Sequence, residues 1–270
     1  LKTDKWELFV NRELDTTLDK SLWVSEENKS NLTNPIPVVR GKSFYLWEPS
    51  NEDYDEWAEL EKLQKHLQNK RLSKTSLFNS LPKNLLEDIN TLPLLNPRIG
   101  FRLITNKTDT RTCIVSILPG KRVLLNSIQY IFFKKGGKVA EGFILGVMSS
   151  FIFDWQLRQV IETNFNKFIF NNLTVPDVSD EIYEEISKIS LTLSFKNKFL
   201  QPWLNDYKQF IYKDKLDSST DYDFKCRLEA LVAKGYGLSE DEIEYIFLNF
   251  HPTSDYKNIL NDVINHYRNL

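Results

Sequence analysis

Residues 98–138 read RIGFRLITNKTDTRTCIVSILPGKRVLLNSIQYIFFKKGGK. Polar and apolar residues alternate through the opening RIGFRL, a pattern typical of a strand with one buried face. The polar residues 105–110 predict a turn, after which residues 111–118 return as an antiparallel strand, and residues 122–133 supply one or two more. This part of the chain therefore predicts an antiparallel or mixed sheet.

Positive charge is concentrated in and around this sheet. Between Arg98 and Pro176 there are eleven Lys and Arg against four Asp and Glu, a net charge of +7, whereas the whole chain sums to −2 and the remainder to −9. A cationic sheet within an acidic chain predicts a surface for a polyanion. We expect Arg98 and Arg102 to lie on an exposed face, with Gly100 between them as bare backbone that a phosphate or a base edge can approach.

Several motifs occur here in the order found in one family of enzymes. The segments RLITN, TRT and ILP resemble the signature of the target-recognition regions of large adenine-specific DNA methyltransferases. Those enzymes include fused type IIG restriction–modification proteins and phage-defence methylases. The segments FDWQLRQ, LTVP, LEALVA and YGL are similar to later motifs of the same family. In this chain the motifs occupy residues 102–106, 110–112, 117–119, 153–159, 173–176, 228–233 and 236–238.

The resemblance implies that the chain is the sequence-recognition module of such an enzyme, with double-stranded DNA as its partner. No catalytic, metal-binding or cofactor-binding residue is expected in this segment. Asn96-Pro97 is followed by Arg98-Ile99 instead of the adenine-binding Asn-Pro-Pro-aromatic loop, no Gly-rich loop suits S-adenosylmethionine, and the three histidines have no ligand-spaced carboxylates or thiols beside them. Methyl transfer from S-adenosylmethionine would belong to a catalytic domain elsewhere in the same parent chain. The parent is expected to be a site-specific DNA adenine methyltransferase in the cytoplasm, and whether it also cleaves DNA stays open.

Ten residues of the sheet are candidate DNA contacts. Arginine suits guanine and asparagine suits adenine in the major groove, so Arg102, Asn106 and Arg111 are assigned to base edges. An alternative for the two arginines is that they fix the hairpin or hold its backbone. The other cations suit phosphates, and residues 134–138 are expected to be flexible. The full set is Arg98, Arg102, Asn106, Lys107, Arg111, Lys121, Arg122, Lys134, Lys135 and Lys138.

The chain before the sheet combines strand and helix patterns. Residues 44–47 alternate as a short strand. A helix is expected to begin at the capping pair Ser50 and Asp53 and to run to Arg71, and a second, short helix is expected over residues 83–90.

After the sheet the pattern becomes mainly helical. Residues 139–150 predict a buried helix in which small residues recur every four positions and permit a close approach of a neighbouring element. A second helix is expected over 154–164, and a strand over 165–170. Beyond residue 178 all the patterns are helical, with capping boxes that pair Thr220 with Asp223 and Ser239 with Glu242.

The fold class predicted from these patterns is α+β, a sheet with packed helices followed by an all-helical C-terminal region. The predicted division is a DNA target-recognition domain over 1–177 and a helical region over 178–270. Cys113 and Cys226 lie in dissimilar contexts, so no disulfide is expected. The longest apolar run, residues 143–153, is too short to cross a bilayer.

A second interpretation comes from a different class of function. The net charge of −2 is unfavourable for a free DNA-binding protein. The chain would then be a protein-interaction scaffold that docks onto a methyltransferase core, with the helical tail as one docking surface and the basic sheet facing an acidic partner domain.

Overall fold

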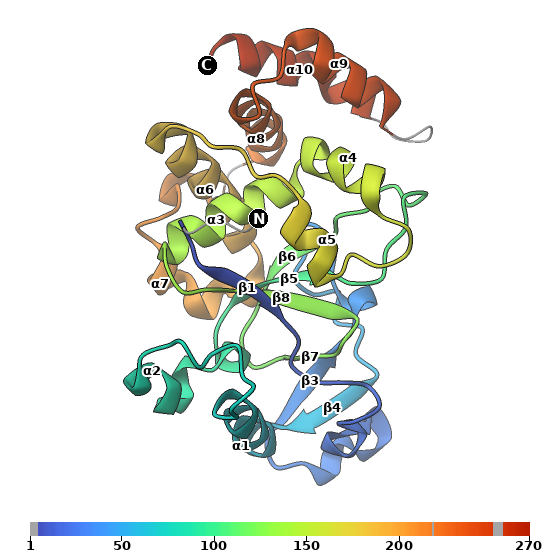
Figure 1. Ribbon diagram of the computed structural model, residues 1–270, viewed down its shortest axis with the longest axis vertical. Coiled ribbons are helices and arrows are strands. Elements are labelled where there is room, and N and C mark those ends of the chain that lie inside the picture. Colours follow the sequence, from blue (N-terminus) through green and yellow to red (C-terminus); the bar gives the residue numbers. More distant parts are fainter. Residues whose placement is uncertain (1–4, 218, 251–255) are drawn as a thin grey trace.

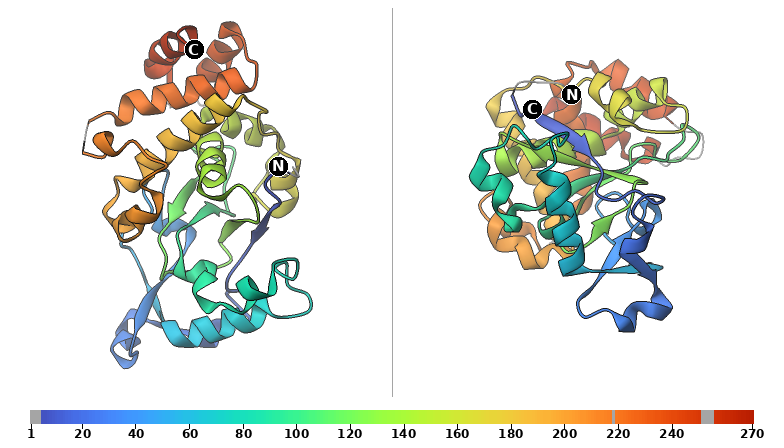
Figure 2. Two further views of the ribbon diagram at one scale, coloured as in Figure 1. Left: turned by 90° about the vertical axis from the view of Figure 1, so that its left-hand side faces the viewer. Right: turned by 60° about the horizontal axis from the view of Figure 1, so that its bottom comes forward.

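The computed structural model describes residues 5–217, 219–250 and 256–270 (Figure 1). It contains two four-stranded sheets and a helical region toward the C-terminus, which confirms the predicted α+β class. The second sheet and the last helices lie at opposite ends of the molecule, with the first sheet between them (Figure 1, Figure 2).

The first sheet contains the predicted hairpin. Its strand order is β1-β8-β5-β6, and all of its pairs are antiparallel. In the hairpin Arg98 pairs with Leu118, while on the other edge of β5 Gly100 pairs with Tyr130. Strand β5 is therefore an interior strand. The bounds are Leu8–Asn11 for β1, Arg98–Arg102 for β5, Val115–Leu118 for β6 and Ile128–Phe133 for β8.

The second sheet has the order β2-β4-β3-β7, and its only parallel pair among the described strands joins β3 to β7. Strand β7 lies between β6 and β8 in the chain. The chain therefore leaves the first sheet, adds a strand to the second, and returns, so that the two sheets are joined. The bounds are Trp23–Ser25 for β2, Pro35–Val39 for β3, Glu56–Glu59 for β4 and Val123–Leu124 for β7.

Helices α1 (Leu60–Arg71) and α2 (Lys83–Glu87) lie between strands β4 and β5 in the sequence. The apolar face of α1, formed by Leu60, Leu63 and Leu67, belongs to the same core as the inward residues of the second sheet. Figure 2 shows α1 running beside that sheet. The short helix over 83–87 agrees with the prediction, and a 3-10 turn continues it.

Two predictions for residues 44–71, between β3 and β5, are wrong. The helix expected from residue 50 begins only at Leu60, because residues 56–59 form β4, which pairs with β2 on one edge and β3 on the other. Residues 44–47 form a tight turn, in which Tyr45 and Glu48 exchange backbone hydrogen bonds and Trp47 has a φ of 62°. The helix starts late because strand pairing places residues 56–59 in a sheet. The strand expected over residues 44–47 is absent because these residues form a turn.

Helix α3 (Gly137–Ser149) packs on both the first sheet and α6 (Asp180–Phe195). A Cβ at Gly142 or Gly146 would collide with the hydroxyl of Ser187 or Ser190 on α6. The predicted spacing of small residues is thus confirmed as a close helix–helix contact.

Two short helices follow α3, namely α4 (Phe151–Val160) and α5 (Lys167–Asn172). A strand was expected at the position of α5. The side chain of Asn166 accepts hydrogen bonds from the amides of Phe168 and Ile169, which starts a helix instead.

The tail is helical, as predicted, and continues with α7 (Leu204–Tyr207), α8 (Asp221–Gly235), α9 (Glu240–Asn249) and α10 (Tyr256–Arg268). The capping box of Ser239 and Glu242 is confirmed, whereas Thr220 makes no side-chain cap. Seven 3-10 segments connect these elements in the described part of the chain: Lys20–Leu22, Glu26–Asn31, Gly41–Ser43, Ile89–Thr91, Pro93–Leu95, Lys198–Trp203 and Lys213–Lys215.

One large core contains residues from the first sheet, from α3 and from the tail, such as Phe101, Phe143 and Leu231. The division at residues 177 and 178 stays a prediction. Cys113 and Cys226 are both buried and free. Among the described helices, none combines the length and the apolar character that a bilayer span requires.

Candidate nucleic-acid interface

Arg98, which the alternation placed on an exposed face, is 4% exposed. Its guanidinium lies 2.8 Å from the carboxylate of Glu13 and donates to the carbonyl of Arg122. Burial raises the pKa of Glu13, and the neighbouring Arg98 acts in the opposite direction. Glu13 also accepts from the amide of Leu124 in β7, so the pair ties the first sheet to the second. The expectation of an exposed Arg98 is wrong, because residue 13 and the β6–β7 turn cover that end of β5.

The backbone at Gly100 is also covered. A Cβ at this position would collide with the side chain of Leu118 and lie 3.3 Å from Ile128. The two neighbouring strands therefore fill the space in which a phosphate was expected to approach. Glycine is required here by packing inside the protein.

Arg111 lies at the centre of a second buried cluster. It is 6% exposed, its Nε is 2.8 Å from the carboxylate of Asp154, and it donates to the carbonyl of Ser149 at 2.6 Å. The guanidinium stacks 4.6 Å from the ring centre of Phe151. These contacts match the alternative in which Arg111 holds the backbone.

Helix α4, which carries Asp154, fixes the loop between β5 and β6. Asp154 is fully buried and accepts hydrogen bonds from the amides of Thr112 and Cys113 at 3.1 Å. One turn further along α4, Arg158 donates to the carbonyls of residues 107, 109 and 110 at 2.5–2.9 Å. The motif FDWQLRQ therefore acts as a clamp on the loop. The clamped loop exposes the side chains of Asn106 and Lys107.

Removing Arg158 is expected to release this loop without unfolding the protein. Its hydrogen bonds are charge-assisted, and each contributes about 1.5–3 kcal/mol. In Arg158→Ala, we expect the amides of residues 106–109 to exchange hydrogen at least about tenfold faster. Gln159→Ala, an exposed neighbour, is the control. Equal exchange in both variants would contradict the clamp.

A buried carboxyl group adjoins the Arg111 cluster. Both oxygens of Glu229, on α8, lie 3.0 Å from the amide of Phe151 at the start of α4. Burial raises the pKa of Glu229 to about 8, although Arg111 and the amide of Phe151 act in the opposite direction. The tail is thus bonded to the helix that clamps the loop.

Arg102 is half-buried and lies against the ring of Phe44 and the ring of Tyr45, at 5.6 Å from each. Its guanidinium donates to the carbonyl of Phe44. It also lines a hollow of about 290 Å³ with Lys42 and Ile104. This arrangement holds the turn of residues 44–47 and leaves part of the arginine accessible.

The remaining candidates lie at the other end of the first sheet. Lys121 and Lys135 are exposed, and Lys135 is paired with Glu7. Lys134 donates to the hydroxyl of Ser80, and Lys138 donates to the hydroxyl of Tyr207 at 2.7 Å.

Arg122, in the turn between β6 and β7, is half-buried and donates to the hydroxyl of Tyr54 at 3.2 Å. Helix α3 begins at Gly137, so the last two residues of the basic run 134–138 belong to its first turn.

The structure therefore does not bring the ten candidates together. In the antiparallel hairpin the loop with Asn106 and Lys107 leaves one end of the strands, and the turn with Lys121 leaves the opposite end. The four paired residues of each strand, at about 3.3 Å per residue, place the loop and the turn roughly 13 Å apart. The candidates differ in exposure. Asn106 and Lys107 are exposed at one end and Lys121 and Lys135 at the other, Arg98 and Arg111 lie in two buried clusters, and the remaining four are half-buried: Arg102, Arg122, Lys134 and Lys138.

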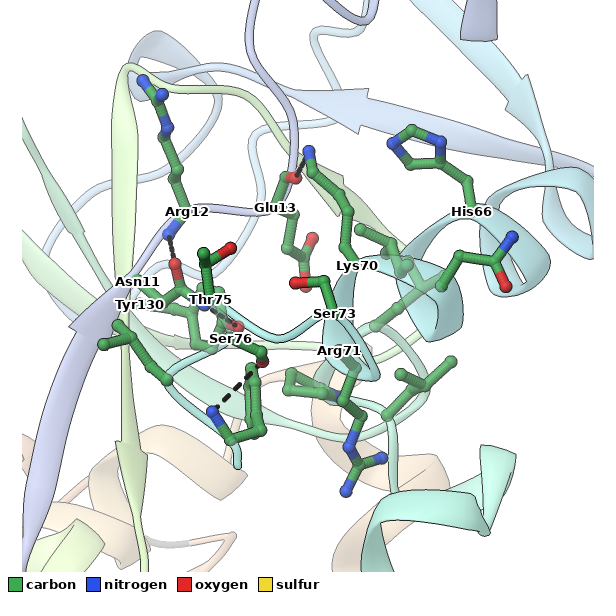
Figure 3. A pocket seen from close by; sticks show the side chains of 17 residues that line it. Asn11, Arg12, Glu13, His66, Lys70, Arg71, Ser73, Thr75, Ser76 and Tyr130 are labelled. Carbon is green, nitrogen blue, oxygen red and sulfur yellow. Dashed lines mark hydrogen bonds between the residues drawn. The ribbon is translucent and has the colours of Figure 1, made fainter. Parts of the chain in front are cut away.

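A large cavity of about 570 Å³ was not anticipated from the sequence (Figure 3). It lies beside the end of α1, and its polar lining includes Arg12, Lys70 and Ser73. The run KRLSKTS at residues 70–76, basic and rich in hydroxyls, was the available signal. Arg12 pairs with Asp15 at 3.0 Å and Lys70 pairs with Asp19 at 2.9 Å, so both cations are already neutralised.

No protein-family model and no curated protein matches this chain. Among solved structures it is similar to the type IIL restriction–modification enzyme MmeI, whose structure was determined in complex with DNA, with a TM-score of 0.50 and 12% sequence identity. The match covers 97% of this chain and 35% of the MmeI chain. At this identity the likeness concerns the fold, and the fold of this chain is one that a restriction–modification enzyme contains.

Proposed function

We propose that this chain is the DNA sequence-recognition module of an adenine-specific DNA methyltransferase in a cytoplasmic restriction–modification or phage-defence system. The proposal rests chiefly on the likeness over 97% of the chain to a restriction–modification enzyme solved with DNA. The ordered motifs between residues 102 and 238 support it. The module itself would be noncatalytic, and S-adenosylmethionine would be bound by a methyltransferase domain of the parent chain.

The clamped loop supports a role in reading DNA. Base recognition requires donors that are held rigidly at a groove. Asn106 and Lys107 project from a backbone that Asp154 and Arg158 fix by hydrogen bonds. In this proposal Asn106 contacts a base and Lys107 a phosphate. Arg98 and Arg111, being buried, would position the sheet and the loop.

The proposal is tested by selection from a pool of random duplexes with the full chain at low salt. We expect one DNA sequence to be enriched and the affinity to fall with increasing salt. No binding to any duplex, together with tight association with a methyltransferase core, would contradict the proposal and favour the scaffold interpretation.

Alanine variants of two matched lysines test which end of the first sheet contacts the DNA phosphates. Lys107 and Lys121 are both exposed, and neither forms an ion pair with a described residue. Each phosphate contact contributes about 0.9 to the slope of log K against log salt. We expect Lys107→Ala to lower that slope by about 1, and Lys121→Ala to do the same if the DNA also spans the opposite end. Unchanged slopes in both variants would rule out the phosphate assignments.

A further inference from the structure

Three arginines of the described chain are almost fully buried: Arg71, Arg98 and Arg111, which are 3%, 4% and 6% exposed. Arg98 and Arg111 each have a carboxylate within 2.8 Å and donate to backbone carbonyls. Arg71 differs from them. Its one hydrogen bond within the described residues goes from Nη1 to the hydroxyl of Thr91, at 2.8 Å.

The environment of Arg71 is unfavourable for a charge. Its Nε is buried without a hydrogen-bond partner. The ring of Phe78, 5.4 Å from the guanidinium, attracts the cation but does not neutralise its charge. Desolvation lowers the pKa of Arg71, and the nearby Tyr130 and Asp88 oppose this only at a distance. A buried guanidinium without an anion is costly, and among the described residues no carboxylate forms an ion pair with Arg71. An anionic group from a partner would therefore stabilise this side chain.

Arg71 borders a pocket of about 330 Å³ on the side of Thr91. Figure 3 shows its guanidinium turned away from Lys70 and His66. The two other cations of the pocket, Arg98 and Lys138, are paired with Glu13 and Glu141. One positive charge is therefore left for a ligand.

The walls and rim of this pocket are mainly apolar. The walls include Leu81, Pro93 and Phe133. Leu85, which lines the pocket, is 40% exposed. Ile89, which precedes the lining residue Asn90 in the chain, is 38% exposed. Exposed leucine and isoleucine side chains around a buried cation suit a protein surface better than a phosphate backbone, because interface cores combine apolar contacts with a few well-placed polar groups.

We propose that this pocket docks a peptide segment of a partner protein, which places one Asp or Glu carboxylate on Arg71 and apolar side chains against Leu85 and Ile89. The carboxylate accepts from the guanidinium and neutralises the buried charge. Arg71, Leu85 and Ile89 are not among the candidate DNA contacts, whereas Arg98 and Lys138, which also line this pocket, are.

The first test compares stability. In Arg71→Met the buried charge is replaced by an apolar side chain of similar length, so we expect a Tm equal to or above that of the unmodified chain. Arg98→Met is the control and is expected to lower Tm, because it leaves Glu13 buried without its cation. A fall in Tm for Arg71→Met as large as that for Arg98→Met would show that Arg71 serves the fold, and would overturn the proposal.

The second test uses a displayed library of random twelve-residue peptides, panned on the full chain. We expect enrichment of peptides with an acidic residue beside apolar residues, and at least tenfold weaker binding of these peptides to Arg71→Met and to Leu85→Asp. Leu85 is partly exposed, so this second variant retains the fold and repels the carboxylate. Peptides without an acidic residue, or no enrichment, would contradict the proposal. Weaker binding of Arg71→Met to random duplex DNA would assign Arg71 to a phosphate contact and would also overturn it.

Discussion

Replacing Asp154 by alanine is expected to destabilise the protein by about 3 to 5 kcal/mol, the range measured when one partner of a buried ion pair is removed. The substitution would leave the guanidinium of Arg111 buried without its carboxylate. It would also remove the acceptor of the amides of Thr112 and Cys113. For a chain of this size the loss corresponds to a fall in Tm of roughly 10 °C.

Chemical denaturation of Asp154→Ala and of Glu162→Ala checks this prediction. Glu162 is an exposed carboxylate shortly after the same helix, so its removal should change the free energy of unfolding by less than about 0.5 kcal/mol. If the two variants were equally stable, the buried cluster would not be what holds the loop to α4.

The second large effect is a pH dependence that arises from Glu229. Burial raises the pKa of this carboxyl to about 8 in the folded protein, whereas the unfolded chain has the ordinary value of 4.5. Between these two values the folded state holds a proton that the unfolded state has released. The stabilisation is therefore complete below pH 4.5 and is lost as the pH rises toward 8, by about 1.4 kcal/mol per pH unit.

Glu229→Gln is the matched variant, because glutamine does not titrate and keeps an acceptor for the amide of Phe151. We expect the free energy of unfolding of the unmodified chain, measured relative to this variant, to fall by about 3 kcal/mol between pH 5 and pH 8. A constant difference across that range would show that Glu229 is ionised in the folded state throughout.

The sequence predicted the elements that local patterns determine. The hairpin of residues 98–118, the buried helix after it and the helical tail were all anticipated, as was the capping box at Ser239. In these cases an alternating pattern, a helical period or a cap acts over a few residues, so no distant partner is required.

What the sequence could not predict depended on distant partners. The alternation in β5 separates two faces, but it does not show that Glu13, 85 residues away, covers the face with Arg98. Strand β4 exists because two other strands pair with it. The same limit explains why the candidate DNA contacts included buried arginines, since a cation that binds DNA and a cation that binds a buried carboxylate look alike in one sequence.

In the proposed function, the sheet and its clamped loop carry the DNA specificity. This assignment is tested most directly by exchanging residues 98–176 between two proteins of this kind that methylate different DNA sites, each hybrid remaining attached to its own methyltransferase domain. We expect the methylated sequence to follow the exchanged block, because in the proposed function the helical tail of residues 178–270 would contribute to stability and assembly. If the hybrids methylated the site of the protein that supplied the tail, the assignment of the reading surface would be contradicted.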